Sequence, residues 1–217
     1  MQQPLKLERA LLDPLASRQQ VSKFCDEARE NGLAGVALHS SRIKQAAHEL
    51  GDSDVKISCL VGFPFGAADM DVKRFETEVA ADAGAHEIYL VPAIALLKDG
   101  RWEQVLRELR DVVESADERV VKVFVEPNHL SSHELEQAVA LVLDSGAQYI
   151  ATSLSQNSAI LDEIRRLREL AGAEFGIIAT IPDDKFDLRL LEEAGANRAL
   201  IANVSSQIRI VEQAFGM

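Results

Sequence analysis

The chain has 217 residues, 47% of them hydrophobic, which is enough for one good-sized core and is typical of a single domain. Acidic residues outnumber basic residues 35 to 23 and no basic run occurs, so neither nucleic acid nor an anionic membrane surface is expected as a partner. The first residues lack the apolar core of a signal peptide, and no stretch has the length and hydropathy of a transmembrane helix. We therefore expect a cytoplasmic protein in which Cys25 and Cys59 are reduced core thiols.

Short runs rich in β-branched residues alternate with stretches of helical period along the whole chain. Eight runs predict strands, at residues 7–12, 34–39, 55–62, 87–91, 120–126, 149–153, 175–180 and 198–203. Between them apolar residues recur at helical spacing, glycine follows several of these stretches, as at Gly84 and Gly146, and Ser131 with Glu134 has the spacing of a capping box. Eight such units at about 27 residues each are close to the minimum for a closed (β/α)₈ TIM barrel. We predict one α/β barrel domain over residues 1–217. An open doubly wound sheet is the alternative, which the lack of a Gly-rich phosphate motif after an early strand disfavours.

The run 120–126 indicates which residues face the inside of this barrel. Its valines share one face of the predicted strand, while Lys122, Phe124 and Glu126 share the other. Because a parallel strand is normally apolar on both sides, the two charged residues need either partners or a chemical task. We expect Lys122 to lie deep in the barrel and Glu126 to lie at the C-terminal end of the strand, where barrel active sites are built.

The order of short motifs along the chain resembles that of the deoxyribose-phosphate aldolase family. The matching pieces are Leu11-Leu12-Asp13-Pro14, Val61-Gly62-Phe63-Pro64-Phe65-Gly66, Lys73 to Glu78, Gly84-Ala85-His86-Glu87-Ile88, Lys122-Val123-Phe124-Val125-Glu126 with Leu130-Ser131, Gly146-Ala147 leading into Thr152-Ser153, and Gly195-Ala196-Asn197-Arg198. The resemblance covers nearly the whole chain. It implies a TIM barrel and an aldehyde-lyase that cleaves 2-deoxyribose 5-phosphate through a lysine imine, without a cofactor.

Matched position by position, most of the family's reactive residues are replaced. The Schiff-base lysine of the sixth strand falls at Ala151, and the second lysine, on the seventh strand, falls at Ala179. The acid that relays protons falls at Tyr89, and an aspartate of the first strand falls at Glu8. Lys122 alone is retained, without the second cation that lowers the pKa of a reactive lysine. The resemblance therefore implies that the family activity is weak or absent in this chain.

We expect a divergent aldolase-type barrel that binds a small carbonyl or sugar-like compound at the C-terminal ends of its strands. The catalytic candidates are Lys122, as amine or electrostatic group, with Glu126 and Tyr89 as proton donors or acceptors. The expected substrate-binding residues are Glu8, His39, Thr152, Ser153, Asn203 and Ser205. No metal site is expected, because His39 and Glu126 lie far apart in the barrel and no local pair of histidines has ligand spacing.

Other interpretations of the same residues stay open. The chain could be an isomerase or dehydratase that uses Glu126 and Tyr89 without an imine, or a non-catalytic binding or regulatory barrel. Lys122 could be half of a buried ion pair with Glu8, and Tyr89 could fill, together with Phe124, the space that smaller residues leave in the barrel. Homo-oligomeric association also stays open.

Overall fold

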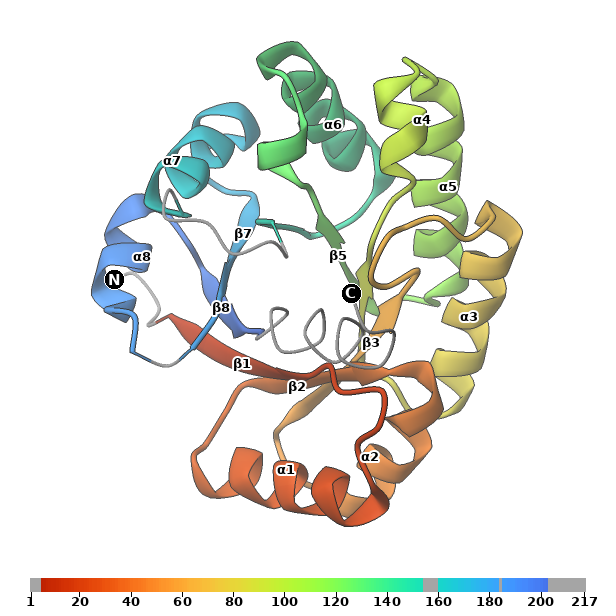
Figure 1. The fold of residues 1–217 in the computed structure, drawn as a ribbon, viewed down its shortest axis with the longest axis vertical. Coiled ribbons are helices and arrows are strands. Elements are labelled where there is room, and N and C mark those ends of the chain that lie inside the picture. The colour runs from red at the N-terminus through yellow and green to blue at the C-terminus, as the bar shows by residue number, and fades with distance from the viewer. Residues whose placement is uncertain (1–4, 154–159, 184, 203–217) are drawn as a thin grey trace, which may run out of the picture.

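The computed structural model describes residues 5–153, 160–183 and 185–202, which form a closed barrel of eight parallel strands in sequence order (Figure 1). The strands are β1 (Lys6–Leu11), β2 (Gly35–His39), β3 (Lys56–Val61), β4 (Glu87–Leu90), β5 (Val120–Phe124), β6 (Tyr149–Ala151), β7 (Gly176–Ile181) and β8 (Arg198–Ile201). β8 pairs with β1, for example through Glu8 and Leu200, and this pairing closes the barrel. The prediction of a (β/α)₈ TIM barrel is confirmed.

Helices form an outer ring around the strands (Figure 1). They are α1 (Arg18–Glu30), α2 (Ile43–Leu50), α3 (Met70–Asp82), α4 (Ile94–Lys98), α5 (Trp102–Ser115), α6 (Ser132–Ser145), α7 (Ile160–Ala171) and α8 (Leu188–Ala194), with short 3₁₀ turns η1 (Ser40–Arg42) and η2 (Pro127–His129). The predicted capping box at the start of α6 is present, since Ser131 and Glu134 satisfy each other's backbone amides. None of the helices in the described ranges is long and apolar enough to cross a membrane.

The period of two along each strand divides the apolar residues into two cores. Val121, Val123 and Val125 point outward into the larger core, which lies between the barrel and the helices and also contains Cys25 and Cys59. Phe124 points inward into a smaller core inside the barrel, made of Leu12, Ala37, Leu60, Tyr89, Val91, Phe124, Ala151, Ile178, Leu200 and Ala202. The alternation predicted for this run is therefore confirmed for residues 121–125. The last two residues of that run lie beyond the end of β5, so Glu126 is at the rim of the barrel.

Candidate functional site

Four charged side chains meet inside the N-terminal half of the barrel. The Lys122 Nζ atom on β5 lies 2.6 Å from Glu8 Oε2 on β1 and 2.5 Å from Glu87 Oε2 on β4. Arg198 on β8 contacts the same two carboxylates, with Nη1 2.8 Å from Glu8 Oε1 and 3.0 Å from Glu87 Oε1. Each carboxylate thus bridges the two cations. The side chains of Glu8 and Lys122 are fully buried, and those of Glu87 and Arg198 nearly so.

This four-residue cluster is electrically balanced, with two carboxylates and two cations. Burial alone would favour the neutral form of Glu87, but the adjacent Lys122 and Arg198 outweigh it and hold the pKa of Glu87 below its ordinary value. The Lys122 amine also donates to Ser58 Oγ at 3.2 Å. Two carboxylates and a hydroxyl thus enclose the Lys122 amine, which leaves no space beside it for the carbon of a substrate carbonyl. The contact between Lys122 and Glu8 is the buried ion pair that the sequence left open as an alternative role for Lys122.

Tyr89 lies inside the barrel and points toward this charged cluster, away from the C-terminal mouth. Its hydroxyl donates to Glu8 Oε2 at 2.9 Å, and its ring stacks on Phe124 with 5.1 Å between the centroids. The Lys122 amine lies 4.2 Å from the centre of the Tyr89 ring, within the range of a cation–π contact. Burial and the neighbouring Glu8 carboxylate raise the pKa of Tyr89 well above its ordinary value. Tyr89 and Phe124 therefore occupy the same inner core as Ala151, as the space-filling interpretation requires.

The structure corrects one of the two positions matched to family lysines. Ala151 points into the barrel, as expected for the Schiff-base position. Ala179 points the other way, into the core between the barrel and the helices, whereas its neighbour Ile178 points inward. Since successive side chains of a strand alternate between faces, a side chain at position 179 does not enter the barrel, and the inward position at this level of β7 is Ile178. Both inward positions carry apolar residues.

The remaining candidates lie at the C-terminal ends of the strands. Glu126 is 7% exposed and lies two residues beyond the end of β5. Ser153 Oγ accepts a hydrogen bond from Asn128 Nδ2 at 3.3 Å. Thr152 Oγ1 accepts the backbone amide of Thr180 at 2.8 Å, which ties the end of β6 to β7.

His39, at the end of β2, is also engaged with its surroundings. Its Nε2 atom lies 2.8 Å from the Leu12 carbonyl, and its ring meets Phe63 edge-on with 5.5 Å between the centroids. Asn203 and Ser205 lie outside the described residues. In the parts of the chain that are described, no group of three histidine, cysteine, aspartate or glutamate side chains is arranged to hold a metal ion.

The candidates thus fall into two groups. Glu8, Tyr89 and Lys122 are joined in the charged cluster, whereas Glu126 and His39 lie at the rim of the barrel. Sequence reasoning missed Glu87 and Arg198, the other two members of the cluster. The signal was present, because Glu87 is two residues before the inward-facing Tyr89, and Arg198 is two residues before the inward-facing Leu200.

Two glycines shape the turn after β3, at the mouth of the barrel. Gly62 has φ +68° and its amide donates to Glu76 Oε2 on α3 at 2.9 Å. Gly66 has φ +64°, and a Cβ atom there would lie 2.0 Å from the Pro92 carbonyl oxygen. A side chain at Gly66 is therefore excluded by both conformation and space. Residues 62–66 therefore form a fixed turn.

A buried ion pair between α3 and α5 holds the segment beneath this turn. Lys73 Nζ lies 2.8 Å from Glu108 Oε1, and the same oxygen accepts the amide of Ala93, in the loop after β4, at 3.2 Å. Burial lowers the pKa of Lys73 and raises that of Glu108, so the pair is held against a desolvation penalty. Glu76 on α3 and Glu108 on α5 thereby hold the loops after β3 and β4 in place, each through a hydrogen bond from the loop backbone.

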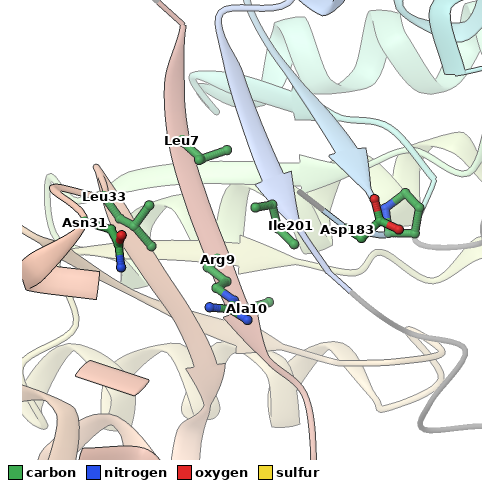
Figure 2. Close-up of a pocket in the computed structure, with 8 residues that line it drawn as sticks. Leu7, Arg9, Ala10, Asn31, Leu33, Asp183 and Ile201 are labelled. Carbon is green, nitrogen blue, oxygen red and sulfur yellow. The ribbon is translucent and has the colours of Figure 1, made fainter. Parts of the chain in front are cut away.

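A groove of about 500 Å³ lies on the outside of the barrel, along β1 and β8 (Figure 2). Its lining includes Leu7 and Arg9 from β1, Ile201 from β8 and Asp183 from the loop after β7. The inward-facing candidates do not line it, and Arg9 already pairs with Glu27. The groove is thus separate from the charged cluster.

The sequence and the fold match one group of known proteins. The family model described as DeoC/LacD family aldolase matches residues 8–160, more than half of the chain. The chain belongs to this aldolase family. The deoxyribose-phosphate aldolase of Thermococcus gammatolerans is 36% identical over 210 residues, which are 94% of this chain and 92% of that protein. The deoxyribose-phosphate aldolase of Bdellovibrio bacteriovorus is 34% identical over 216 residues, 98% of this chain and 96% of that protein.

Solved structures of aldolases share the fold of this DeoC/LacD family member. The aldolase QR15 superposes with a TM-score of 0.83 at 26% identity and covers 96% of each chain. The deoxyribose phosphate aldolase of Aeropyrum pernix, described as a unique tetrameric structure, superposes with a TM-score of 0.81 at 28% identity, over 92% of this chain and 86% of that one. The resemblance seen in the sequence motifs is therefore confirmed at the level of family and fold.

Proposed function

We propose that this DeoC/LacD family barrel binds a small carbonyl or sugar-like compound at its C-terminal mouth, and that it cleaves 2-deoxyribose 5-phosphate weakly or not at all. The observation that carries the proposal is the state of Lys122, which is fully buried and held by Glu8 and Glu87 at 2.6 and 2.5 Å. An imine requires an unprotonated amine that a carbonyl carbon can reach. A carbonyl carbon cannot reach the enclosed Lys122 amine, so we assign Lys122 an electrostatic role in the inner cluster.

The other positions inside the barrel support the same proposal. Among the described residues the fully buried lysines are Lys73 and Lys122, and Lys73 is committed to Glu108 between two helices. The inward residues Ala151 and Ile178 cannot form an imine. Among the described residues, the polar groups at the mouth include the Glu126 carboxyl group, the His39 ring and the Ser153 hydroxyl. These groups recognise hydroxyls and carbonyl oxygens by hydrogen bonding.

Reductive trapping tests the absence of imine chemistry. The protein is incubated with 2-deoxyribose 5-phosphate, acetaldehyde or a small ketone, reduced with borohydride and examined by mass spectrometry. The relative from Thermococcus gammatolerans, treated in parallel, shows whether the trapping conditions work. We expect no adduct and little or no cleavage in this chain. An adduct mapping to Lys122, or cleavage at a rate comparable with that relative, contradicts the proposal.

A thermal-shift screen with small sugars and carbonyl compounds tests binding at the mouth. A ligand present at about 100 times its Kd stabilises the folded state by about 2.7 kcal/mol, which is easily measured. We expect stabilisation that is reduced in Glu126→Gln and unchanged in Lys98→Gln, because Lys98 lies on the outer helices and pairs with Glu134. A ligand shift that is equal in all three proteins places the site elsewhere.

A second candidate function is acid–base chemistry without an imine, as in an isomerase or dehydratase. It is favoured by Glu126, a nearly buried carboxyl group at the C-terminal end of β5, which is the usual location of a general base in a barrel. NMR of each stabilising ligand after incubation separates the two functions. A binding protein returns the ligand unchanged, whereas the enzyme converts it and loses the conversion in Glu126→Gln.

A further inference from the structure

A pocket of about 420 Å³ lies at the N-terminal end of the barrel, opposite the mouth. Its lining includes Lys6, Tyr149, Gly176 and Arg198, which are the first residues of β1, β6, β7 and β8. Each of them stands two residues before an inward-facing position of its strand, so all four lie on the inner face of the barrel. The pocket therefore leads from the surface to the charged cluster, of which Arg198 is a member.

The guanidinium group of Arg198 is paired at only one of its three nitrogens. Nη1 donates to Glu8 Oε1 at 2.8 Å and to Glu87 Oε1 at 3.0 Å. Nε is buried, and among the described residues neither Nε nor Nη2 has an acceptor. These two nitrogens form one edge of the planar guanidinium, the edge that can bind both oxygens of a carboxylate side by side. Buried donors normally have acceptors, so this edge indicates a ligand.

The residues around Arg198 hold its guanidinium in position. The Cζ atom lies 4.3 Å from the centre of the Tyr149 ring, within the range of a cation–π contact. The Tyr149 ring in turn occupies the space beside Gly176, where a Cβ atom would lie 2.3 Å from the ring atom Cδ1. With its Nη1 atom anchored on two carboxylates, Arg198 is oriented before a ligand arrives, and this lowers the cost of binding.

The charges of the pocket select the kind of ligand. The cluster behind Arg198 is already balanced, so a carboxylate bound there adds a negative charge, which Lys6, the register partner of Arg198, can offset. The lining also includes the acids Glu174 and Glu192, which repel a dianion such as phosphate and attract an ammonium group. The side-chain amide of Gln148 is bonded to backbone groups at both ends. The charged side chains therefore determine what the pocket accepts.

We propose that this N-terminal pocket binds a small zwitterion of the amino-acid class. The carboxylate of the ligand lies on the Nε and Nη2 edge of Arg198, beside Lys6, and its ammonium group lies by Glu174 and Glu192. A volume of about 420 Å³ is within the range of small-molecule sites. The site is at the opposite end of the barrel from the mouth, so it does not depend on the function proposed there.

An NMR titration of the full chain tests the site. The probes are glycine, 4-aminobutyrate and L-lysine, which differ in the distance between carboxylate and ammonium, and butyrate, butylamine and phosphate are the comparison compounds. The readout is the Nε–H resonance of Arg198, assigned by its loss in Arg198→Lys, a variant that keeps the positive charge facing Glu8 and Glu87. We expect at least one amino acid to shift this resonance saturably, with a Kd of about 1 mM.

The comparison compounds decide whether both charges of the ligand are recognised. We expect butyrate, butylamine and phosphate to bind at least about tenfold more weakly than the best amino acid. Butyrate or phosphate binding as tightly as that amino acid overturns the zwitterion as the ligand. An Arg198 Nε–H resonance that none of the compounds shifts saturably overturns the site.

Variants at the rim test the ammonium contact and leave Arg198 in place. In Glu174→Gln/Glu192→Gln we expect the amino acid to bind about tenfold or more weakly, whereas butyrate binds no worse than to the native chain. Glu193→Gln is the matched control, because Glu193 is an exposed acid beside Glu192 on α8 that is not part of the pocket lining, and it should bind like the native chain. Equal affinity of the double variant and the native chain for the amino acid overturns the proposed contact.

Discussion

Removing the amine of Lys122 leaves the two buried carboxylates of Glu8 and Glu87 facing the single cation of Arg198. In Lys122→Met the cluster then carries one uncompensated negative charge, in a place where none of its side chains was more than 11% exposed. Breaking a buried ion pair from one side lowers the free energy of unfolding by about 3–5 kcal/mol. At about 2–4 °C per kcal/mol for a chain of this size, we expect Tm to fall by about 6–20 °C.

A double-mutant cycle separates the ion pair from the loss of packing. Glu8→Gln alone leaves two cations and one carboxylate, so it too is expected to destabilise the fold. In the double variant Glu8→Gln/Lys122→Met, the remaining Glu87 and Arg198 balance each other, and a direct contact between them is already present at 3.0 Å. We therefore expect the double variant to lose less than the sum of the single losses, with a coupling free energy of at least about 2 kcal/mol.

Urea unfolding followed by far-UV circular dichroism measures all four proteins. The slope of unfolding free energy against urea should stay the same, so that a change in midpoint reports stability. Losses that add to within about 0.5 kcal/mol would show that Lys122 and Glu8 do not interact in the folded protein. The same result would remove the reason for assigning Lys122 an electrostatic role, because the amine would then be free to react.

Three further outcomes follow from the same contacts. Because the pKa of Tyr89 is raised in the folded protein, the stability that Tyr89 contributes is fully present below the pKa of a tyrosine in the unfolded chain and is lost as the pH rises above it. Urea unfolding at about pH 8 and about pH 10.5 should therefore show a larger loss of stability for the native chain than for Tyr89→Phe. Gly66→Ala should lower the unfolding free energy by about 3 kcal/mol or more, because the added Cβ atom meets the backbone of Pro92. Gly32 has a similar φ of +61° but open space around it, so Gly32→Ala should lower the unfolding free energy by only about 1 kcal/mol. Equal losses in the two variants would contradict the fixed turn. Ala151→Lys alone should be less stable than the native chain and show no trapped imine, because it buries an amine without a carboxylate partner. Ala151→Lys/Tyr89→Asp supplies that carboxylate and should be more stable than the single variant. Equal stability of the two variants would contradict this argument from charge.

The fold could be predicted from the sequence because each unit repeats the same local pattern. Eight β-branched runs separated by helical stripes give both the number and the order of the strands, and the observed strand ends differ from the predicted ones by no more than a few residues. Alternation also placed Lys122 and Phe124 inside the barrel. The motif match at Ala179 did not show which face that residue occupies, and the structure places Ala179 in the outer core; in a strand, a shift of one residue exchanges the faces.

The composition of the charged cluster could not be predicted in the same way. Its members come from four different strands, and their meeting depends on which residues share a level of the closed barrel. Sequence alternation restricts Glu87 and Arg198 to the inner face, but only the register between strands brings them to the height of Lys122. In α3 the sequence pattern points to the wrong face of the helix. Apolar periodicity alone would turn Val72 and Phe75 toward the core, but in the structure both are exposed. The side that faces the core is occupied by Lys73, which pairs with Glu108.

Charge balance connects the side chains inside the barrel with one another. Glu8 and Glu87 are matched by Lys122 and Arg198, and the side chains above them, including Tyr89, Ala151 and Ile178, are apolar or uncharged. A protonated lysine placed at position 151 would enter this interior without a carboxylate to receive it, since Glu8 and Glu87 are already matched and Tyr89 is uncharged. The side chains inside the barrel therefore form one set that is consistent in charge. Introducing an amine there requires changes at several inner positions together, because each single change leaves a buried charge without a partner.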